Sequence, residues 1–233
     1  GSPDLLMSRS DPALRALLKR TRSIPIVFVV VADPVGNGLV TSLARPGGNA
    51  TGFSNAEASL AGKFPELLVE MAPHVRHITI LGHPETLATG TFTPPVVAAA
   101  RALNRETSFV AIRGPSDIEN GIRSAAQRPD AAIVVLPSII INANRELLIS
   151  ATAANRVPTV YPFGFFARQG GLVSYGLDVP HLFREAAGYA DRIFRGAVVA
   201  DLPIQQPAKF ELVINLKTAA TTGGVKVPVA RVS

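Results

Sequence analysis

The chain contains no cysteine and no tryptophan, and only three of its 233 residues are tyrosine. Without cysteine there are no disulfide bonds, thiolate metal sites or cysteine nucleophiles, and this absence favours neither redox compartment. No apolar run approaches the ~18–20 residues that cross a bilayer. The first residues, GSPD, lack a basic region followed by an apolar one, so we expect no signal peptide in this chain.

Sequence motifs of common enzymes are also missing. Neither Gly-x-Ser-x-Gly nor Gly-x-Gly-x-x-Gly nor a P-loop pattern occurs, and Gly36-Asn37-Gly38 lacks a third glycine. His74 and His77 are three residues apart at an expected strand start, where that spacing does not bring two side chains together. We therefore expect surface histidines, no metal, no cofactor and no catalytic residues.

Charge is sparse and scattered. Charged residues make up 17% of the chain, with a net charge of +6, and the hydrophobic content is 47%. The densest basic group is Arg15, Lys19, Arg20 and Arg22, without aromatic residues beside it. We interpret it as a solvated helix end, so nucleic acid is not an expected partner.

Apolar runs that suit buried strands alternate with amphipathic segments that suit helices. The residues from 24 to 31 (IPIVFVVV) and from 131 to 136 (AAIVVL) have no polar alternation, which is typical of strands covered on both faces of a parallel sheet. The other expected strands are 50–53, 76–82, 107–112, 158–161, 172–175 and 209–215. The expected helices are 11–21, 57–71, 94–103, 116–126, 144–155, 163–168 and 178–195, with a short helix and tail over 218–232 and a linker over 200–207. Repeated βα units predict one or two parallel sheets.

A helix before the first strand is unusual for such a sheet. Two features of the helices are also specific predictions: Pro65 should kink its helix or restart it, and Ser116 with Glu119 has the spacing of a capping box.

The stretch from 24 to 63 offers two strand ends, and ligands of open α/β sheets bind beyond such ends. One is Asp33-Pro34, where a role as a turn and a role in ligand binding have equal weight. The other runs from Thr51 to Ser54, with Asn49 just before it. These residues offer hydroxyls and an amide to a polar ligand, although Asn49 could instead stabilise its own Gly-Gly turn.

Aromatic residues gather near two later strand ends. Tyr161 and Tyr175 each end an expected strand, and this position favours the lining of an apolar pocket. For Phe165 and Phe166, on the short helix between them, we favour core packing.

Four segments carry a family resemblance: IPIVFVVVADPVGNGLVTSLARPGGNATGFS, ELLVEMAPHVRHITIL, PTVYPFGFFARQGGLVSYG and ADLPIQQPAKFELVINLKTA. Together they resemble the substrate-binding proteins of ABC transporters, of the tryptophan- and tyrosine-binding kind. The resemblance implies a two-lobed periplasmic-binding-protein fold with parallel sheets flanked by helices. It also implies an exported, often lipid-anchored protein in the periplasm that delivers a small amino-acid-like ligand to a membrane permease.

The resemblance implies that further βα units precede this region in the family, so the first lobe is expected to be incomplete. The expected domains are a partial first lobe over 1–82, a second lobe over 83–174, and a return segment with a tail over 175–233. An incomplete sheet has an open edge and an exposed apolar face, which favours self-association.

Position by position, the resemblance implies ligand contacts in both lobes, with hinge closure on binding. From the first lobe they are Asp33, Pro34, Thr51 and Gly52; from the second, His83, Pro84, Pro137, Ser138 and Tyr161; and at the return crossing, Tyr175 and Asp178. An Asp33 or Asp178 carboxylate would pair with a ligand amino group. His83-Pro84 replaces the usual Asn-Pro of the family. A ligand-sensing domain and a small-substrate α/β enzyme are the alternative functions.

Overall fold

The computed structural model describes residues 1–54, 58–206 and 209–227. The expected helix start at residue 57, the end of the linker at residue 207 and the tail over 228–232 lie outside these residues. The chain divides into two compact units. Unit 1 comprises Gly1–Ala56 and Leu177–Phe210, and unit 2 comprises Glu57–Gly176 and Glu211–Ser233.

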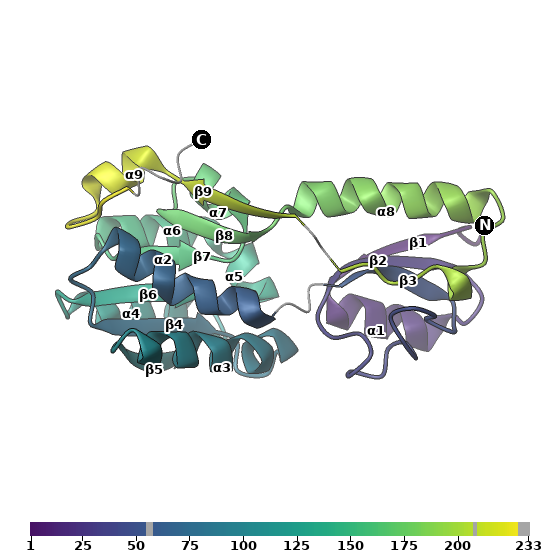
Figure 1. Ribbon diagram of the computed structural model, residues 1–233, viewed down its shortest axis with the longest axis horizontal. Helices are drawn as coiled ribbons and strands as arrows, with labels where there is room; N and C mark the ends of the chain where they lie inside the picture. The colour runs from purple at the N-terminus through teal and green to yellow at the C-terminus, as the bar shows by residue number, and fades with distance from the viewer. Residues whose placement is uncertain (55–57, 207–208, 228–233) are drawn as a thin grey trace. The chain divides into compact units, whose positions relative to one another are not determined.

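Within its described residues, unit 1 contains a three-stranded parallel sheet in the order β1-β2-β3. Its strands are β1 (Leu6–Arg9), β2 (Ile26–Val31) and β3 (Ala50–Ser54). Helix α1 (Asp11–Arg20) covers one face and α8 (Val179–Phe194) covers the other (Figure 1). Because β2 lies between two strands and two helices, all six of its residues are buried. The prediction that this apolar run forms a strand covered on both faces is therefore confirmed.

The strand β1 precedes the first helix, so the expectation of a chain that opens with a helix is wrong. This strand has only four residues, of which Met7 and Arg9 are exposed. A four-residue edge strand is too short for its periodicity to be recognised in the sequence.

In unit 2, the described residues form a six-stranded sheet in the order β5-β4-β6-β7-β8-β9. The pairings from β5 through β8 are parallel, which confirms parallel sheets flanked by helices. The strands are β4 (His77–Gly82), β5 (Glu106–Ala111), β6 (Ala131–Val135), β7 (Thr159–Tyr161), β8 (Val173–Leu177) and β9 (Phe210–Ile214).

Helices cover both faces of the unit 2 sheet (Figure 1). On one face, Ile78, Ile80 and Val134 share a core with α2 (Lys63–Met71) and α3 (Leu87–Ala102). On the other, Leu81 lies against Gly121 of α4 (Pro115–Ala126). The remaining helices of the unit are α5 (Ile139–Ala143), α6 (Arg145–Ala154), α7 (Gly164–Arg168) and α9 (Leu216–Thr221).

The structure tests three expectations about where helices begin, and only the first is confirmed. Pro65 does restart its helix: a 3-10 helix (Ala58–Gly62) precedes α2, and proline is tolerated in the first turn that follows. Helix α3 begins at Leu87 and not at 94, because Thr86 caps it and the two prolines lie inside. The capping box at Ser116 is wrong, since α4 starts at Pro115 and the Asp117 carboxylate accepts from the Gly114 N–H instead.

The division into units differs from the expected domains 1–82, 83–174 and 175–233. The boundaries between the two units lie after residues 56, 176 and 210. Strand β4 pairs with both β5 and β6, which places residues 77–82 in the middle of the unit 2 sheet. The segment after residue 210 also belongs to unit 2, through β9. Across the described part of the chain, no helix is both long enough and apolar enough to cross a membrane.

Candidate functional site

The carboxyl end of β2 forms a tight turn. Asp33 is exposed, has a positive φ of 38°, and accepts a hydrogen bond from the Gly36 N–H at 2.9 Å. Pro34 is buried, and its carbonyl accepts from the Leu39 N–H at 2.9 Å. The carboxylate of Asp33 therefore stabilises the turn, which is one of the two roles predicted for Asp33-Pro34.

Thr51 and Gly52 lie inside β3 and not at its end. Thr51 is fully buried, and its hydroxyl donates to the Leu202 carbonyl at 2.7 Å. Gly52 has a φ of 150°, and a Cβ there would come within 2.0 Å of the Phe28 carbonyl oxygen. Both residues therefore serve the packing of unit 1.

Asp178 caps helix α8 in unit 1. Its Oδ1 accepts from the His181 N–H at 2.9 Å, and the Lys209 Nζ lies 3.6 Å from its Oδ2. The hydrogen bond from His181 and the nearby lysine hold the pKa of this carboxyl below its ordinary value. Both oxygens therefore already have partners within the unit.

In unit 2, two predicted pairs follow strand ends. His83 and Pro84 follow β4 and are half-buried; the His83 Nδ1 accepts from the Glu85 N–H at 3.3 Å. Pro137 and Ser138 follow β6, and Ser138 is 6% exposed. The sequence thus located both turns correctly relative to their strands.

Tyr161 belongs to the core of unit 2. Its ring is fully buried and stacked on Phe166 with centroids 5.0 Å apart, and its hydroxyl is 2.7 Å from the Thr152 hydroxyl. Burial raises the pKa of the Tyr161 phenol above its ordinary range. Tyr175 is half-buried and packs against the unit 2 core. The core packing expected for Phe166 is confirmed, whereas Phe165 is only partly buried.

Sequence reasoning missed several buried polar side chains at the carboxyl ends of the strands. In unit 1 they are Ser8 and Asp11; together with Ser54, which was a candidate from the sequence, we call them the unit 1 cluster. The Ser8 and Ser54 hydroxyls and the Asp11 Oδ1 are buried and have no hydrogen-bond partner among the described residues. Buried polar atoms in proteins are usually hydrogen-bonded, so these three atoms require an explanation.

A matching set lies in unit 2. It consists of Ser138, Asn142 and Ser174, which we call the unit 2 cluster, and within the described chain their Oγ, Oδ1 and Oγ atoms also lack partners. Ser174 pairs with Tyr161, the last residue of β7, so it is level with the carboxyl end of that strand. Of these residues, only Ser138 was predicted. No sequence signal distinguishes the others, because a lone serine or asparagine is common in any helix or strand.

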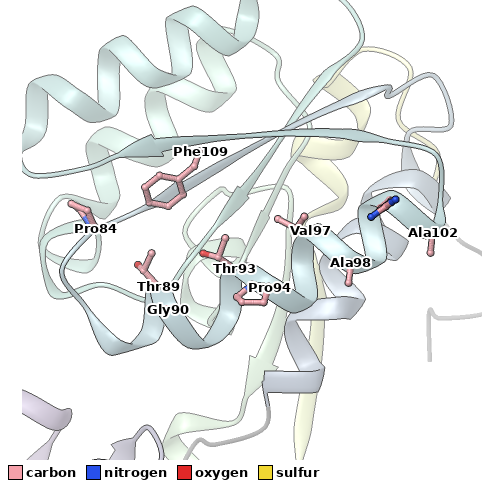
Figure 2. A pocket seen from close by; sticks show the side chains of 10 residues that line it. Pro84, Thr89, Gly90, Thr93, Pro94, Val97, Ala98, Ala102 and Phe109 are labelled. Carbon is pink, nitrogen blue, oxygen red and sulfur yellow. The ribbon is translucent and has the colours of Figure 1, made fainter.

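An open groove of about 1080 Å³ runs along α3 in unit 2, beside the edge strand β5 (Figure 2). Its lining is mainly apolar, with Val97 and Phe109 exposed, and Arg101 at one end. Of the predicted site residues, Pro84 lines it. Neither cluster lies in this groove.

Metal binding has no support in the described residues, which contain no group of three or more candidate metal-ligating side chains. His77 contacts β5 instead: its Nε2 is 2.8 Å from the Ser108 hydroxyl, and its Nδ1 is 3.5 Å from the Glu106 carboxylate. His74 is exposed, as expected.

Two helix-covered α/β units, between which the chain crosses three times, define the periplasmic-binding-protein-like class of folds. The ABC domain in complex with L-Trp from Streptococcus pneumonia superposes with a TM-score of 0.86 at 25% identity, over 99% of this chain and 78% of that one. A conserved domain protein from Vibrio cholerae gives a TM-score of 0.86 at 27% identity, over 98% and 76%.

Sequence comparison identifies the family. The model of the ABC transporter substrate binding protein family matches residues 1–229, so the chain belongs to that family, which is one of binding proteins and not of enzymes. A curated relative, the tyrosine-binding protein of Clostridioides difficile (strain R20291), is 26% identical over 215 residues. The match covers 92% of this chain, and the chain spans 61% of that relative.

Proposed function

We propose that this chain is the solute-binding component of an ABC importer and that its ligand is a small amino acid, preferably an aromatic one. The observation that carries the proposal is the presence, in each unit, of buried and unpartnered polar atoms at the carboxyl ends of parallel strands. Such strand ends are where α/β sheets bind their ligands. Membership of the family and relatives that bind tyrosine or L-Trp support the same ligand class.

Each cluster has side chains whose chemistry suits one charged group of an amino acid. The unit 1 cluster contains a carboxylate, which attracts an ammonium group. The unit 2 cluster contains two hydroxyls that can donate to a carboxylate, and the amide of Asn142. We keep His83, Pro84 and Pro137 as further contact candidates, because they follow strands and are not fully buried. We also keep Tyr175, which lies in the middle of β8 and not at the expected strand end, because it is only half-buried. Delivery to a membrane permease and a periplasmic or lipid-anchored location follow from the same proposal.

A thermal-shift screen of the purified chain tests this function. At a ligand concentration 100-fold above Kd, binding stabilises the native state by about 2.7 kcal/mol. For a chain of this size that corresponds to a rise in Tm of roughly 5–10 °C. We expect at least one of tryptophan, tyrosine and phenylalanine to give this rise, followed by saturable binding in calorimetry.

Variants connect the binding to the site. Ser138→Ala and Ser174→Ala should each weaken the bound amino acid by about 5- to 10-fold, since each removes one hydrogen bond to the ligand. Ser116→Ala is the matched control, because Ser116 is exposed on α4. If no aromatic or branched amino acid raises Tm, the proposed function is wrong.

A further inference from the structure

Strand β5 is an open edge of the unit 2 sheet. It is the first strand in the order β5-β4-β6-β7-β8-β9, and within the described residues it pairs with β4 alone. None of its six residues is buried, whereas all but the first residue of β4 are buried. An edge of this kind presents backbone N–H and C=O groups with which another strand can pair.

The hydrogen bonds to β4 show which backbone groups of β5 point away from the sheet. The N–H groups of Glu106 and Ile112 each donate to a carbonyl on the β4 side at 2.9 Å. Successive residues of a paired strand direct their backbone groups to opposite sides. Thr107, Phe109 and Ala111 therefore direct their N–H and C=O groups to the open edge.

The side chains of the same three residues face the groove along α3, which we call the α3–β5 groove. Phe109 lines this groove (Figure 2), whereas Val110 lies on the other face, where its Cγ1 would be 3.0 Å from a Cβ at Gly121 of α4. Because side chains alternate between the two faces of a strand, Thr107 and Ala111 share the face of Phe109. A segment that paired with the open edge would therefore place every second side chain over the groove.

The groove offers an apolar surface to those side chains. Val97 and Phe109 are 38% and 42% exposed, and Pro94, Ala98 and Ala102 of the lining are exposed as well. At about 3.3 Å per residue, the six residues of β5 extend over about 20 Å. An extended segment of similar length thus fits both the edge and the groove beside it.

Three arginines lie around β5. Arg101 lines the groove at one end, Arg105 precedes the strand and Arg113 follows it. The ion pairs of the described residues include none of the three. The carboxylate of Glu106 lies on the face opposite the groove, 3.5 Å from the His77 Nδ1.

Two further carboxylates are found near the other end of the strand. Glu85 is exposed directly after Pro84, which lines the groove. Asp117 accepts hydrogen bonds from the N–H groups of Arg113 and Gly114, at 2.8 and 3.1 Å. The charge around the groove is therefore positive at the Arg101 end and mixed at the opposite end.

A second copy of this chain fits the edge poorly. The symmetric antiparallel pairing that uses all three open residues places Phe109 opposite Phe109 of the copy, and it therefore places Arg105 opposite Arg113. Like charges directly opposite each other destabilise a strand pair. An acidic segment would instead be attracted to the Arg101 end.

We propose that the open edge of β5 and the α3–β5 groove bind an extended segment of a partner protein by strand addition. The segment has apolar side chains at every second position, over the groove, and an acidic side chain near Arg101. This docking surface is separate from the strand-end clusters and does not depend on the amino acid that the chain binds.

Fluorescence anisotropy with a fluorescein-labelled peptide, ETVTVTVTE, tests the proposal on the whole chain. Its valines share one face, and a glutamate at each end allows either strand direction to place a carboxylate near Arg101. We expect saturable binding that is at least about 3-fold tighter than that of the control peptide KTVTVTVTK. The variant Arg101→Glu should reverse this preference.

Two N-methylated forms of the peptide test the backbone pairing. One form carries methyl groups on the amides of its valines, and the other on the amides of its threonines. In a strand added to β5, only one of these sets points to the edge, so one form should bind at least about 5-fold more weakly than the other. The loss of flexibility is similar in both forms, which makes each the control for the other.

The variant Thr107→Pro removes one donor from the open edge. Proline is tolerated at an edge position whose N–H faces solvent, so the pairing with β4 should remain. We expect about 3- to 10-fold weaker binding of ETVTVTVTE. Thr107→Val is the matched control, because it loses the hydroxyl and keeps the N–H, and its affinity should equal that of wild type.

Each contrary result overturns the proposal. Absence of saturable binding, or equal affinities of the two N-methylated forms, excludes strand addition. An unchanged peptide preference in Arg101→Glu excludes the acidic partner. A wild-type dimer in sedimentation equilibrium that Thr107→Pro abolishes would identify a second copy as the occupant. If Thr107→Pro does not fold, the two N-methylated forms decide.

Discussion

Replacing Tyr161 by phenylalanine separates a role in the core from a role in ligand binding. Sequence reasoning placed this tyrosine in the pocket, whereas the structure buries it fully beneath α6 and α7, with its hydroxyl 2.7 Å from that of Thr152. The substitution removes one oxygen and leaves the stacking on Phe166 unchanged. We expect lower stability and unchanged affinity.

The magnitude follows from the hydrogen bonds that remain. The Thr152 hydroxyl lies 3.0 Å from each of the Leu148 and Ile149 carbonyls, so it keeps a partner after the substitution. The loss is then the net value of one buried hydrogen bond, about 0.5–1.5 kcal/mol. Tyr161→Ala removes the ring as well and should cost about 3–5 kcal/mol.

Urea unfolding followed by far-UV circular dichroism measures the stability, and calorimetry with the bound amino acid measures the affinity. Two units can unfold separately, so the transitions of wild type and variant must first be compared in shape. A core role predicts a lower midpoint and a Kd within about twofold of wild type. A tenfold weaker Kd at unchanged stability would refute the core assignment.

Two further predictions concern residues of unit 1. Gly52→Ala should cost at least about 3 kcal/mol of stability or prevent folding, because its Cβ would meet the Phe28 carbonyl. The control Gly90→Ala has open space around its Cβ in α3 and should change stability by less than about 1 kcal/mol. Equal thermal midpoints of the two variants would contradict this prediction. Asp178→Ala should cost about 1 kcal/mol at neutral pH through loss of the α8 cap. Because the folded pKa of Asp178 is lowered, this contribution is present above the unfolded pKa and is lost as pH falls through the folded pKa. Unfolding curves at neutral and acidic pH measure it, and a pH-independent difference would show that the charge is irrelevant.

The fold was largely accessible from the sequence because its buried strands are continuous apolar runs. Such runs, as in β2 and β6, can be accommodated only where helices cover both faces of a sheet. The short edge strand β1 and the start of α3 were missed for a physical reason. Local pattern does not determine whether Met7 pairs with a neighbouring strand, or whether a helix continues through Pro94.

The site was less accessible, because the sequence shows where a strand ends but not which way its side chains face or what they already contact. Thr51 and Tyr161 have polar groups of the right kind, yet each hydroxyl has a partner inside its own unit. Ser54 lies three positions after Thr51 in the same strand, and its hydroxyl has no hydrogen-bond partner among the described residues. The hydroxyls of Thr51 and Tyr161 have partners because the fold brings Leu202 and Thr152 against them. The sequence pattern does not show these tertiary contacts.

The two clusters also bear on what determines ligand selectivity under the proposed function. If Ser138 and Ser174 help to hold the ligand carboxylate, both contacts are made to a group that every α-amino acid shares. These contacts then set the affinity for the class, and discrimination among amino acids must come from surfaces that meet the side chain. The partly buried aromatic rings of Tyr175 and Phe165 are the unit 2 groups that suit an aromatic ligand. Variants of the clusters should therefore weaken all amino acids alike, and variants of these rings should change their order.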